Sequence, residues 1–403
     1  MFNCRICKKE LGKDHLYLKL NNCPLTDEFL DFNSDKKEYI KDISIFKCNF
    51  CGTVQNPCNF DYSSYYQDYQ YSSGGSNFTK RFMLNYKDAC VKLFRDLNGK
   101  EPRFIIEPGS GDGEQLLFFI DDKFQVCGVE PSQSLSDIAN ARGINTITSL
   151  FTYKYVRDNK KTNFDICLSS YTLDHCPDPL DYLKAANYSL NKNGILAIEI
   201  HDLEKIIKRS EYCLFEHEHT IYLSEKNIEL ILKITGFELC LANPIPERIT
   251  RANSLIVIAR KVSKPYELEK SQEIIEKNRS NFLVNSNQQK LGETIKELIN
   301  RLDTWASSKG NKLVGYGAGG RGVMTLSQMK TGSKFLALLD KNFDNRNLKT
   351  PITRIPIVGP SAWKKYNNCY VLVFSFGYYK EILNDLISIG FNKERIISLE
   401  SFF

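Results

Sequence analysis

The sequence has no apolar run long enough to cross a bilayer. None of its stretches approaches the ~18 to 20 consecutive apolar residues that a membrane-spanning helix needs. The segment MFNCRICKKELGKDH at the start of the chain also lacks the apolar core of a secretion signal. We therefore expect a cytoplasmic protein without a membrane partner, whose 13 cysteines are mostly reduced thiols or metal ligands.

A strongly basic surface is missing as well. The 54 Lys and Arg residues are balanced by 48 Asp and Glu residues, which leaves a net charge of +6. No basic stripe with interleaved aromatic residues appears, so nucleic acid is not an expected partner. The mild positive charge suits an anionic small molecule. A chain of 403 residues predicts two or three domains, each able to bury a core.

What the sequence does contain is a glycine-rich turn between two apolar runs, within residues 104–131. The run Phe104–Ile106 is followed by the turn Gly109-Ser110-Gly111-Asp112-Gly113 and by apolar residues at helical spacing. A second apolar run, residues 124–129, ends at Glu130. This order predicts a strand, a turn, a helix and a second strand, the first half of a nucleotide-binding α/β unit.

Carboxylates in this turn indicate which nucleotide it binds. Glu107 and Asp112 would repel a pyrophosphate but suit a ligand with an ammonium and a sulfonium group, and Glu130 can accept two hydrogen bonds from a ribose diol. We therefore expect S-adenosylmethionine rather than NAD. The alternative is a turn that needs glycine only for its geometry. The residues expected to contact the cofactor are Glu107, Gly109, Ser110, Gly111, Asp112, Glu130, Pro131 and Ser170.

Two cysteine pairs near the start of the chain have metal-ligand spacing. Cys4 and Cys7 form one C-x2-C motif, and Cys48 and Cys51 form the other. In a reducing compartment this arrangement predicts a structural zinc site, although the gap of ~40 residues is longer than usual. Cys23 and Cys58 are nearby thiols that could replace a ligand. Disulfides or ordinary buried cysteines are the alternatives.

A segment rich in Tyr, Ser and Gly follows, over residues 61–86. Its tyrosines follow neither helical nor strand periodicity. One interpretation is a solvated loop that packs a few rings on its neighbours. The other is a lid that presents phenol hydroxyls to a substrate.

Beyond Glu130 the alternation of helices and strands continues. We expect helices at residues 132–142, 181–190 and 225–235 and strands at 145–148, 164–170, 195–200 and 255–259, with a turn at Asn193-Gly194. This alternation predicts a mainly parallel sheet. His175 follows one of these strands closely, at the end of the sheet where ligands bind in such folds.

Four of the five histidines lie between residues 175 and 219, and the densest patch is Glu216-His217-Glu218-His219. Histidine beside glutamate is a natural general base, because the carboxylate orients the ring and raises its basicity. A metal site and a polar connection before the next helix explain the same residues. The pattern by itself leaves all three open.

A second α/β unit follows a charged stretch at residues 261–312, which we expect to be a linker and helices. A strand at 313–316 leads into Gly317-Ala318-Gly319-Gly320-Arg321-Gly322, a helix at 323–329 and a strand at 335–339 that ends before Asp340. A further strand at 370–374 is followed by Ser375. This predicts a Rossmann-like domain in which Arg321 can face a phosphate. A structural module with an empty crevice is the alternative.

Together these motifs resemble the three-domain, zinc-containing C-methyltransferases that use S-adenosylmethionine to modify nucleotide-linked deoxysugars. The resemblance covers nearly the whole chain, with motifs in the same order and spacing. They are Cys4-x2-Cys7 with Cys23-Pro24-Leu25 and Phe29-Leu30, FKCNFCGTVQ, the segment ending Tyr71-Ser72-Ser73, EPGSGDG with GVEPS, LDHCPDP, EHEH before Tyr222-Leu223-Ser224, and GYGAGGRG with a later LLD.

The resemblance implies an α/β fold with three parts. Residues 1–75 would form a small zinc-binding domain with a tyrosine-rich lid, and residues 76–260 a Rossmann-like class I methyltransferase domain. Residues 261–403 would form a second Rossmann-like domain that closes over the nucleotide sugar. We expect a monomer or a weak dimer.

The resemblance also implies the chemistry, which is methylation of a carbon next to a sugar ketone through an enolate. His219 would be the base, Glu218 would orient it, and His175 would lie near the reacting atoms, while Tyr71 would donate a hydrogen bond to the sugar. The residues expected to bind the substrate are Tyr222, Asn253, Gly317, Gly319, Arg321, Asp340 and Ser375.

The chain departs from the family at two places where the substrate should lie. Glu216 stands where the family carries a tyrosine, and Ala252-Asn253-Ser254 replaces a Gly-Gly-Ser segment. Two other functions therefore remain open. One is methylation of an oxygen on a sugar or a related anionic metabolite, and the other is a non-catalytic module that binds zinc and a nucleotide.

Overall fold

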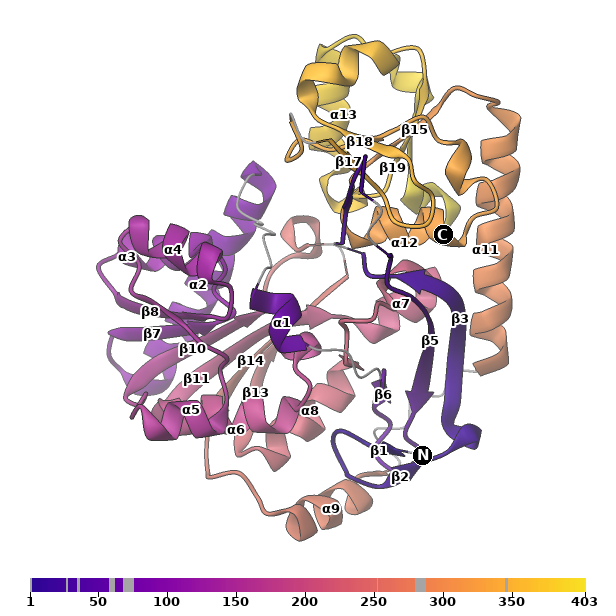
Figure 1. Cartoon of the computed structure of the whole chain (residues 1–403). Coiled ribbons are helices and arrows are strands. Elements are labelled where there is room, and N and C mark those ends of the chain that lie inside the picture. Colours follow the sequence, from indigo (N-terminus) through magenta and orange to yellow (C-terminus); the bar gives the residue numbers. More distant parts are fainter. Residues whose placement is uncertain are drawn as a thin grey trace. The chain divides into compact units, whose positions relative to one another are not determined.

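The chain forms two compact units in the computed structural model, which describes residues 2–26, 28–34, 37–57, 62–67, 76–251, 253–279, 288–344 and 347–403 (Figure 1). Unit 1 comprises Met1–His15, Phe46–Leu203 and His219–Val284, and unit 2 comprises Leu16–Ile45, Glu204–Glu218 and Asn285–Phe403. Tyr71, Cys58 and Ala252 lie outside the described residues.

Unit 1 is built on a seven-stranded sheet in the order β13-β14-β11-β10-β7-β8-β9. Neighbouring strands from β11 to β9 run parallel, whereas β14 runs antiparallel to both of its neighbours. The expected α/β fold with a mainly parallel sheet is therefore confirmed. The strands are β7 (Phe104–Pro108), β8 (Gln125–Glu130), β9 (Thr146–Thr148), β10 (Phe164–Ser170), β11 (Leu190–His201), β13 (Phe237–Ala242) and β14 (Ser254–Lys261), of which β13 was not predicted.

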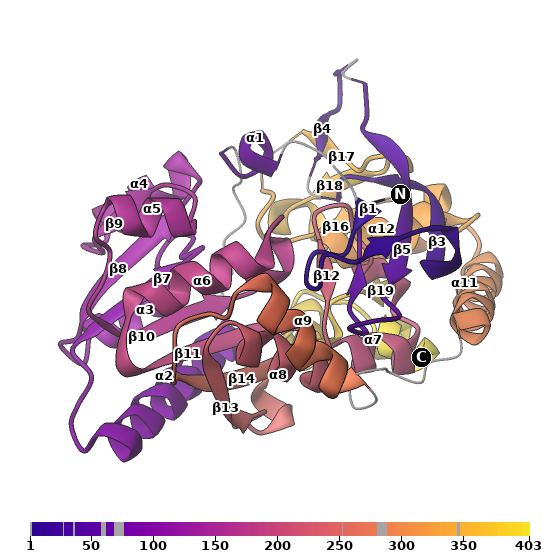
Figure 2. The ribbon, with the colours of Figure 1, turned by 90° about the horizontal axis from the view of Figure 1, so that it is seen from below.

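Side chains of these strands alternate between two buried faces, as the period of two requires. Ile105 and Ile166 lie in a core with Phe82 and Phe119, which come from α2 and α3. Ile106 and Leu196 face the other way, into a core with residues of α6 and α8. Figure 2 shows α6 lying along β10 and β11. Both faces are covered, which explains why these strands are apolar throughout.

The helices α4, α6 and α8 of unit 1 begin and end within two residues of the expected positions. Ser76 caps α2 by accepting a hydrogen bond from the backbone N–H of Thr79, and Gly99 ends it in the left-handed region. The helices are α1 (Tyr62–Gln67), α2 (Asn77–Asn98), α3 (Glu114–Ile120), α4 (Gln133–Ala141), α5 (Tyr153–Asp158), α6 (Pro179–Ser189), α8 (Glu225–Ile234) and α9 (Leu268–Lys277). Among the described residues no helix is both long enough and apolar enough to span a bilayer.

The expected turn at Asn193-Gly194 is wrong, because these residues lie inside β11. Asn193 has a φ of 58°, and the register between β10 and β11 shifts at this point. The turn-forming residues therefore produce a bulge near the start of the strand instead of ending it.

The first residues of unit 1 form short hairpins that hold the cysteines. β1 (Phe2–Asn3) pairs with β2 (Glu10–Leu11), and β6 (Val54–Gln55) pairs with β12 (Ile221–Tyr222) and with Phe46 and Lys47 of β5 (Ile40–Lys47).

Unit 2 contains a second seven-stranded sheet, in the order β20-β19-β15-β16-β18-β17-β4. The strands from β20 to β18 run parallel, whereas β17 pairs antiparallel with β18 and β4. The second Rossmann-like sheet is therefore confirmed. Its strands are β4 (Leu30–Asp31), β15 (Leu313–Tyr316), β16 (Leu338–Leu339), β17 (Leu348–Lys349), β18 (Pro356–Val358), β19 (Tyr370–Val373) and β20 (Ile396–Ser398). Unit 2 also contains the strand β3 (Leu16–Pro24) and the helices α7 (Leu203–Arg209), α11 (Gln288–Ser308), α12 (Gly320–Gln328) and α13 (Tyr379–Ser388).

The glycine turn of unit 2 gives a test of this fold. A Cβ at Gly322 would overlap the backbone carbonyl oxygen of Gly317, whereas a Cβ at Gly319 would meet nothing within 4 Å. We expect Gly322→Ala to destabilise unit 2 by about 2 to 3 kcal/mol and Gly319→Ala, the matched control, to change it by less than about 1 kcal/mol. Both tryptophans, Trp305 and Trp363, lie in unit 2, so urea unfolding followed by tryptophan fluorescence reports on this unit. Equal midpoints for the two variants would contradict the close approach.

Candidate active site

The glycine turn of unit 1 lies directly against the segment that follows β10. Gly109 has a φ of 68°, and a Cβ there would overlap the hydroxyl of Thr172. Gly113 begins α3 with a φ of 82°, and a Cβ there would overlap the side chain of Ile144. Only glycine combines a positive φ with the absence of a Cβ at these two positions. The turn and the segment after β10 therefore lie against each other and form one surface at the carboxyl ends of the strands.

Glu130 is fixed by the turn. Its Oε2 accepts a hydrogen bond from the backbone N–H of Gly111 at 2.8 Å, and its Oε1 accepts one from Ser132 at 2.9 Å. Burial raises the pKa of Glu130, and these two hydrogen bonds act in the opposite direction. Each carboxylate oxygen keeps a second lone pair, so the residue can still accept from a diol. Asp112, also in the turn, forms an ion pair with Arg142 at 3.1 Å.

In β7 and the glycine turn after it, residues 104–113, two buried polar atoms have no hydrogen-bond partner among the described residues. They are Oε2 of Glu107 and Oγ of Ser110, which belong to residues only 3% and 7% exposed. Burial raises the pKa of the Glu107 carboxyl to about 8, against the lowering effect of Arg251. Buried polar groups are normally paired, so these atoms indicate a polar ligand. Pro131 follows β8 and Ser170 ends β10, and both residues are half-buried. Strands β8 and β10 pair with β7, which carries Glu107.

Three histidines and one aspartate gather where β10 and β11 end. Asp174 and His175 lie in a 3-10 helix, Leu173–His175, which follows β10, and His201 is the last residue of β11. The His175 and His219 ring centroids are 4.7 Å apart, and those of His201 and His219 are 4.8 Å apart. Asp174 Oδ2 lies 2.7 Å from Nδ1 of His201. The structure therefore brings His175 and His219 together, as the sequence predicts.

The carboxylate of Asp174 is buried but ionised. Burial by itself would raise the pKa of Asp174, but the hydrogen bond from His201 and the surrounding histidines hold it below its usual value. One carboxylate oxygen of Asp174 and one nitrogen from each of His201 and His219 lie within 4.8 Å of one another.

Tyrosines complete this cluster. The hydroxyl of Tyr66, on α1, lies 2.7 Å from Nδ1 of His175. The ring of Tyr222 lies 6.1 Å from that of His219. Asn253 is buried with a φ of 67°, and its backbone oxygen accepts a hydrogen bond from Asp202. Tyr66 thus contacts a site histidine from the tyrosine-rich segment in which the sequence singled out Tyr71.

Asp174, His201 and Tyr66 are site residues that the sequence reasoning missed. A usable signal existed for His201, because it ends a buried strand that neighbours the one before His175. Asp174 is adjacent to His175 in the sequence. Tyr66 carried no distinguishing signal, because several tyrosines surround it.

Glu218 has a different environment from the one expected. Its Oε1 accepts a hydrogen bond from the hydroxyl of Thr26 at 2.9 Å, within unit 2. Its Oε2 is buried and has no hydrogen-bond partner in the described part of the chain. Glu216 also lies near the Thr26 hydroxyl, at 3.4 Å, and a Cβ on Gly320 would overlap the Glu216 carboxylate.

In unit 2 the predicted substrate-binding residues gather at the ends of β15, β16 and β19. Asp340 accepts a hydrogen bond from the backbone N–H of Ala318 at 2.9 Å, and a Cβ on Gly317 would lie 2.9 Å from the Ser375 hydroxyl. Gly319 is the N-cap residue of α12. The guanidinium of Arg321 lies over the ring of Phe376 and 3.5 Å from a carboxylate oxygen of Glu211.

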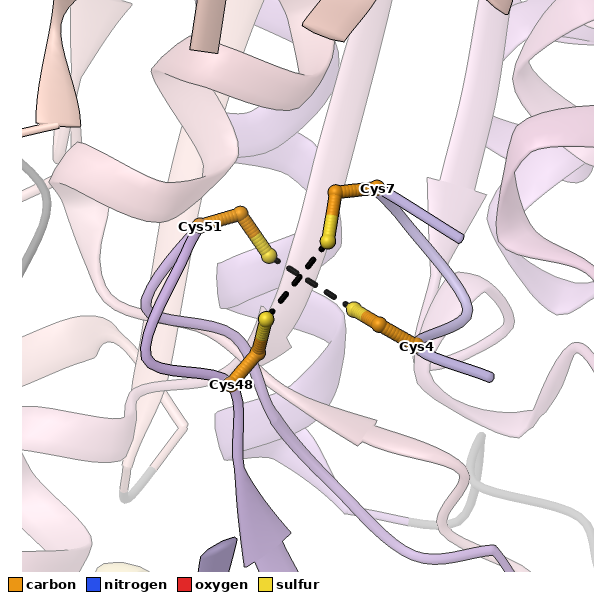
Figure 3. Close-up of side chains that lie close together, drawn as sticks. All are labelled: Cys4, Cys7, Cys48 and Cys51. Carbon is orange, nitrogen blue, oxygen red and sulfur yellow. Dashed lines mark hydrogen bonds between the residues drawn. The ribbon is translucent and has the colours of Figure 1, made fainter. Parts of the chain in front are cut away.

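The four N-terminal cysteines converge as the spacing predicts (Figure 3). The Cys4 and Cys51 sulfurs are 3.6 Å apart, and those of Cys7 and Cys48 are 3.5 Å apart. A tetrahedral zinc site with Zn–S bonds of ~2.3 Å has sulfurs ~3.8 Å apart, so the arrangement fits with little movement. Hydrogen bonds among the four thiols lower the pKa of Cys4 and raise the pKa values of Cys7 and Cys51, because the clustered sulfurs share their protons.

Comparison with known proteins identifies two domains. Residues 81–241 match the sequence profile of a methyltransferase domain, and residues 256–398 match that of a C-methyltransferase C-terminal domain. The chain therefore has the domains of a methyltransferase. Over 95% of its length it is 22% identical to C-methyltransferase NovU of Streptomyces niveus, and the match covers 91% of that protein.

Solved methyltransferase structures are similar to part of this chain. The plantazolicin methyltransferase BpumL in complex with SAH matches 50% of this chain and 89% of its own, with 14% identity and a TM-score of 0.39. The magnesium protoporphyrin IX methyltransferase ChlM from Synechocystis PCC 6803, with bound SAM, matches 50% of this chain and 98% of its own, with 14% identity and a TM-score of 0.36.

The raised pKa of Glu107 makes the stability of the unliganded protein depend on pH. The folded chain holds this proton more tightly than the unfolded chain, so the stabilisation is full below the ordinary glutamate pKa and is lost as the pH rises through about 8. We expect Glu107→Gln to lose less stability than the wild type between pH 5 and pH 9. Urea unfolding followed by circular dichroism at several pH values measures the difference, with the exposed Glu101→Gln as a control. Parallel curves for wild type and Glu107→Gln would contradict the assignment.

Proposed function

We propose that the protein uses S-adenosylmethionine to methylate a carbon next to the ketone of a nucleotide-linked deoxysugar. The observation that carries this proposal is the gathering of His175, His201 and His219 around the ionised Asp174, next to the glycine turn of unit 1. Carbon methylation needs a base close to the cofactor, and this surface contains one. The resemblance of the whole chain to enzymes of nucleotide-linked deoxysugars supports the substrate class.

The turn fits the cofactor by its chemistry. The unpartnered Glu107 carboxyl is suited to the ammonium group, and Glu130 to the ribose hydroxyls. Gly109, Gly111 and Gly113 allow close approach of the backbone to the ligand. When bound, S-adenosylmethionine supplies an electrophilic methyl group on a sulfonium.

His219 is the proposed base. It lies 4% exposed between the rings of His175 and His201, where it is shielded from bulk water. It would take the proton from the substrate carbon next to the ketone, and the electron pair of the broken C–H bond would move into the enolate. Tyr66 holds Nδ1 of His175 and so fixes the orientation of that ring. The ring of Tyr222, a proposed substrate contact, lies 6.1 Å from the ring of His219.

Unit 2 would bind the nucleotide part of the substrate with Gly317, Gly319, Arg321, Asp340 and Ser375. Support comes from their position at the carboxyl ends of parallel strands, where α/β folds bind ligands. The carboxylates of Glu211 and Glu216 lie at the same turn, so the phosphate would contact the guanidinium of Arg321 in competition with Glu211.

We also propose that Cys4, Cys7, Cys48 and Cys51 hold a structural zinc ion. All four are buried, and four thiolate ligands leave no open coordination position for chemistry. The ion would connect two segments that are distant in sequence, as loop-closing metals do.

A single assay tests the proposed reaction. His219→Ala should lower turnover by about 100-fold or more and leave the binding of S-adenosylmethionine nearly unchanged, because the base acts on the substrate and not on the cofactor. The measurements are the methyl gain of nucleotide 4-keto-6-deoxysugars and the uptake of deuterium from heavy water next to the ketone. His15→Ala, outside the cluster, is the control.

Two results would contradict this proposal. Equal loss of turnover and cofactor binding in His219→Ala would mean that His219 is structural. A methyl gain in the wild type without deuterium uptake would indicate an oxygen acceptor.

Metal content tests the zinc site. The purified protein should contain about one zinc ion per chain, and Cys48→Ser should lose the ion and expose the N-terminal segment to proteolysis. Cys240→Ser, which changes a thiol on β13 away from the cluster, should keep the metal. A folded, active protein without any metal would rule the site out.

A further inference from the structure

Asp174 and His201 have no part in the reaction as described so far, although they lie at its centre. Both belong to the cluster that contains His219, and the Asp174 side chain is 3% exposed and that of His201 16% exposed. A buried carboxylate that stays ionised costs several kcal/mol unless its partners compensate for the lost water. The pair is therefore a feature that calls for a function.

The hydrogen bond between the two residues fixes which nitrogen of His201 is available. An ionised carboxylate only accepts, so Nδ1 of His201 carries the proton of the 2.7 Å hydrogen bond to Asp174. Within the part of the chain that the structure describes, Asp174 is the only hydrogen-bond partner of the His201 ring. Its other nitrogen, Nε2, is left for a ligand.

The ring of His201 is also held from the side. The ring of Tyr171 lies 4.6 Å from it, and the Tyr171 hydroxyl is 2.8 Å from the Ser254 hydroxyl, which in turn donates to Glu199. Arg251 lies over the ring of Tyr171 and pairs with Glu199. Together with the hydrogen bond to Asp174, these contacts restrict the ring of His201, which lies next to that of His219.

We propose that His201, positioned by Asp174, is a second catalytic residue that donates a hydrogen bond from Nε2 to the ketone oxygen of the substrate. The assignment rests on the proposed function. In the enolisation step His219 takes the proton from the carbon, and the C–H electron pair forms the carbon–carbon double bond. The carbonyl electron pair moves onto the oxygen, which accepts the hydrogen bond from Nε2 of His201, while Nδ1 of the same ring stays bonded to Asp174. The step is reversible and needs no further reactant.

The neighbouring histidines His201 and His219 take different roles because their surroundings differ. His201, whose Nδ1 is bonded to Asp174, serves as the hydrogen-bond donor to the ketone oxygen. The ring centroid of His219 lies 4.8 Å from that of His201, and His219 serves as the base. Glu218, which the sequence suggested as the orienting carboxylate, is bonded to Thr26 instead. The carboxylate that orients a site histidine in the structure is Asp174.

The test is the exchange of deuterium next to the ketone, in heavy water and without S-adenosylmethionine. Two substitutions separate the roles of the two imidazole nitrogens. In His201→Asn the amide replaces Nδ1 and keeps a hydrogen-bond partner for Asp174. In His201→Gln the amide keeps a donor near the position of Nε2. We expect His201→Asn to lower the exchange rate by about 100-fold and His201→Gln to lower it less. Asp174→Asn should lower it by about 10-fold or more with little change in KM. His15→Gln is the control.

The outcomes separate this proposal from the proposed function. No exchange in the wild type with any ketosugar would overturn both. Exchange in the wild type that persists at the same rate in His201→Asn would overturn only the role of His201, and so would intact exchange with loss of methyl transfer. A second metal ion per chain that disappears in His201→Asn would make the residue a metal ligand instead. Equal circular dichroism spectra and zinc contents of all variants establish that the folds are comparable.

Discussion

The ionised carboxylate of Asp174 is the constraint around which unit 1 is assembled. Its side chain is hydrogen-bonded to His201, and this bond joins the end of β11 to the segment after β10. Its backbone oxygen accepts a hydrogen bond from the backbone N–H of Thr220 at 2.7 Å, which holds the neighbouring His219 in place. The Thr220 backbone oxygen accepts in turn from Asn56, close to the cysteine cluster. Asp174 thus connects the histidines to the segment that carries the cysteines, through its side chain and through its backbone. The cost of leaving its buried charge unpaired favours this arrangement.

The two glycine turns of the chain each connect a parallel strand to a helix but differ in their polar surroundings. In unit 1, Oε2 of Glu107 before the turn and Oγ of Ser110 within it lack hydrogen-bond partners among the described residues, which suits a ligand that completes their hydrogen bonds. In unit 2 the corresponding turn is already engaged by the carboxylates of Asp340 and Glu216. A helix N-terminus attracts negative charge, and here the chain supplies much of that charge itself. Similar folds therefore carry different sites.

Most of the architecture could be predicted from the sequence because it depends on local patterns. Apolar runs of strand length, helical spacing and glycine turns predicted the central strands of both sheets and the helices α4, α6, α8 and α12 to within a few residues. They did not predict β4, β17, β18, β20, α5, α7 or α13. The departures have local causes too. Asn193 and Gly194 read as a turn but form a bulge, because the neighbouring strand β10 continues the pairing on both sides. β13 alternates too weakly in its burial to stand out, with half-buried and exposed residues after Phe237.

The sequence by itself determined the fold class, the two glycine turns, the two cysteine pairs and the histidine-rich character of the site. Each of these depends on residue types at short spacing, which the chain carries whatever its path. Only the tertiary structure decided that Asp174 and not Glu218 is the carboxylate bonded to a site histidine, and that Tyr66 reaches His175. Such contacts form between segments distant in the chain, as in the hydrogen bond between residues 66 and 175 and the ring contact between residues 175 and 219. Which side chains meet there depends on packing of the whole unit, and spacing along the sequence does not contain that information.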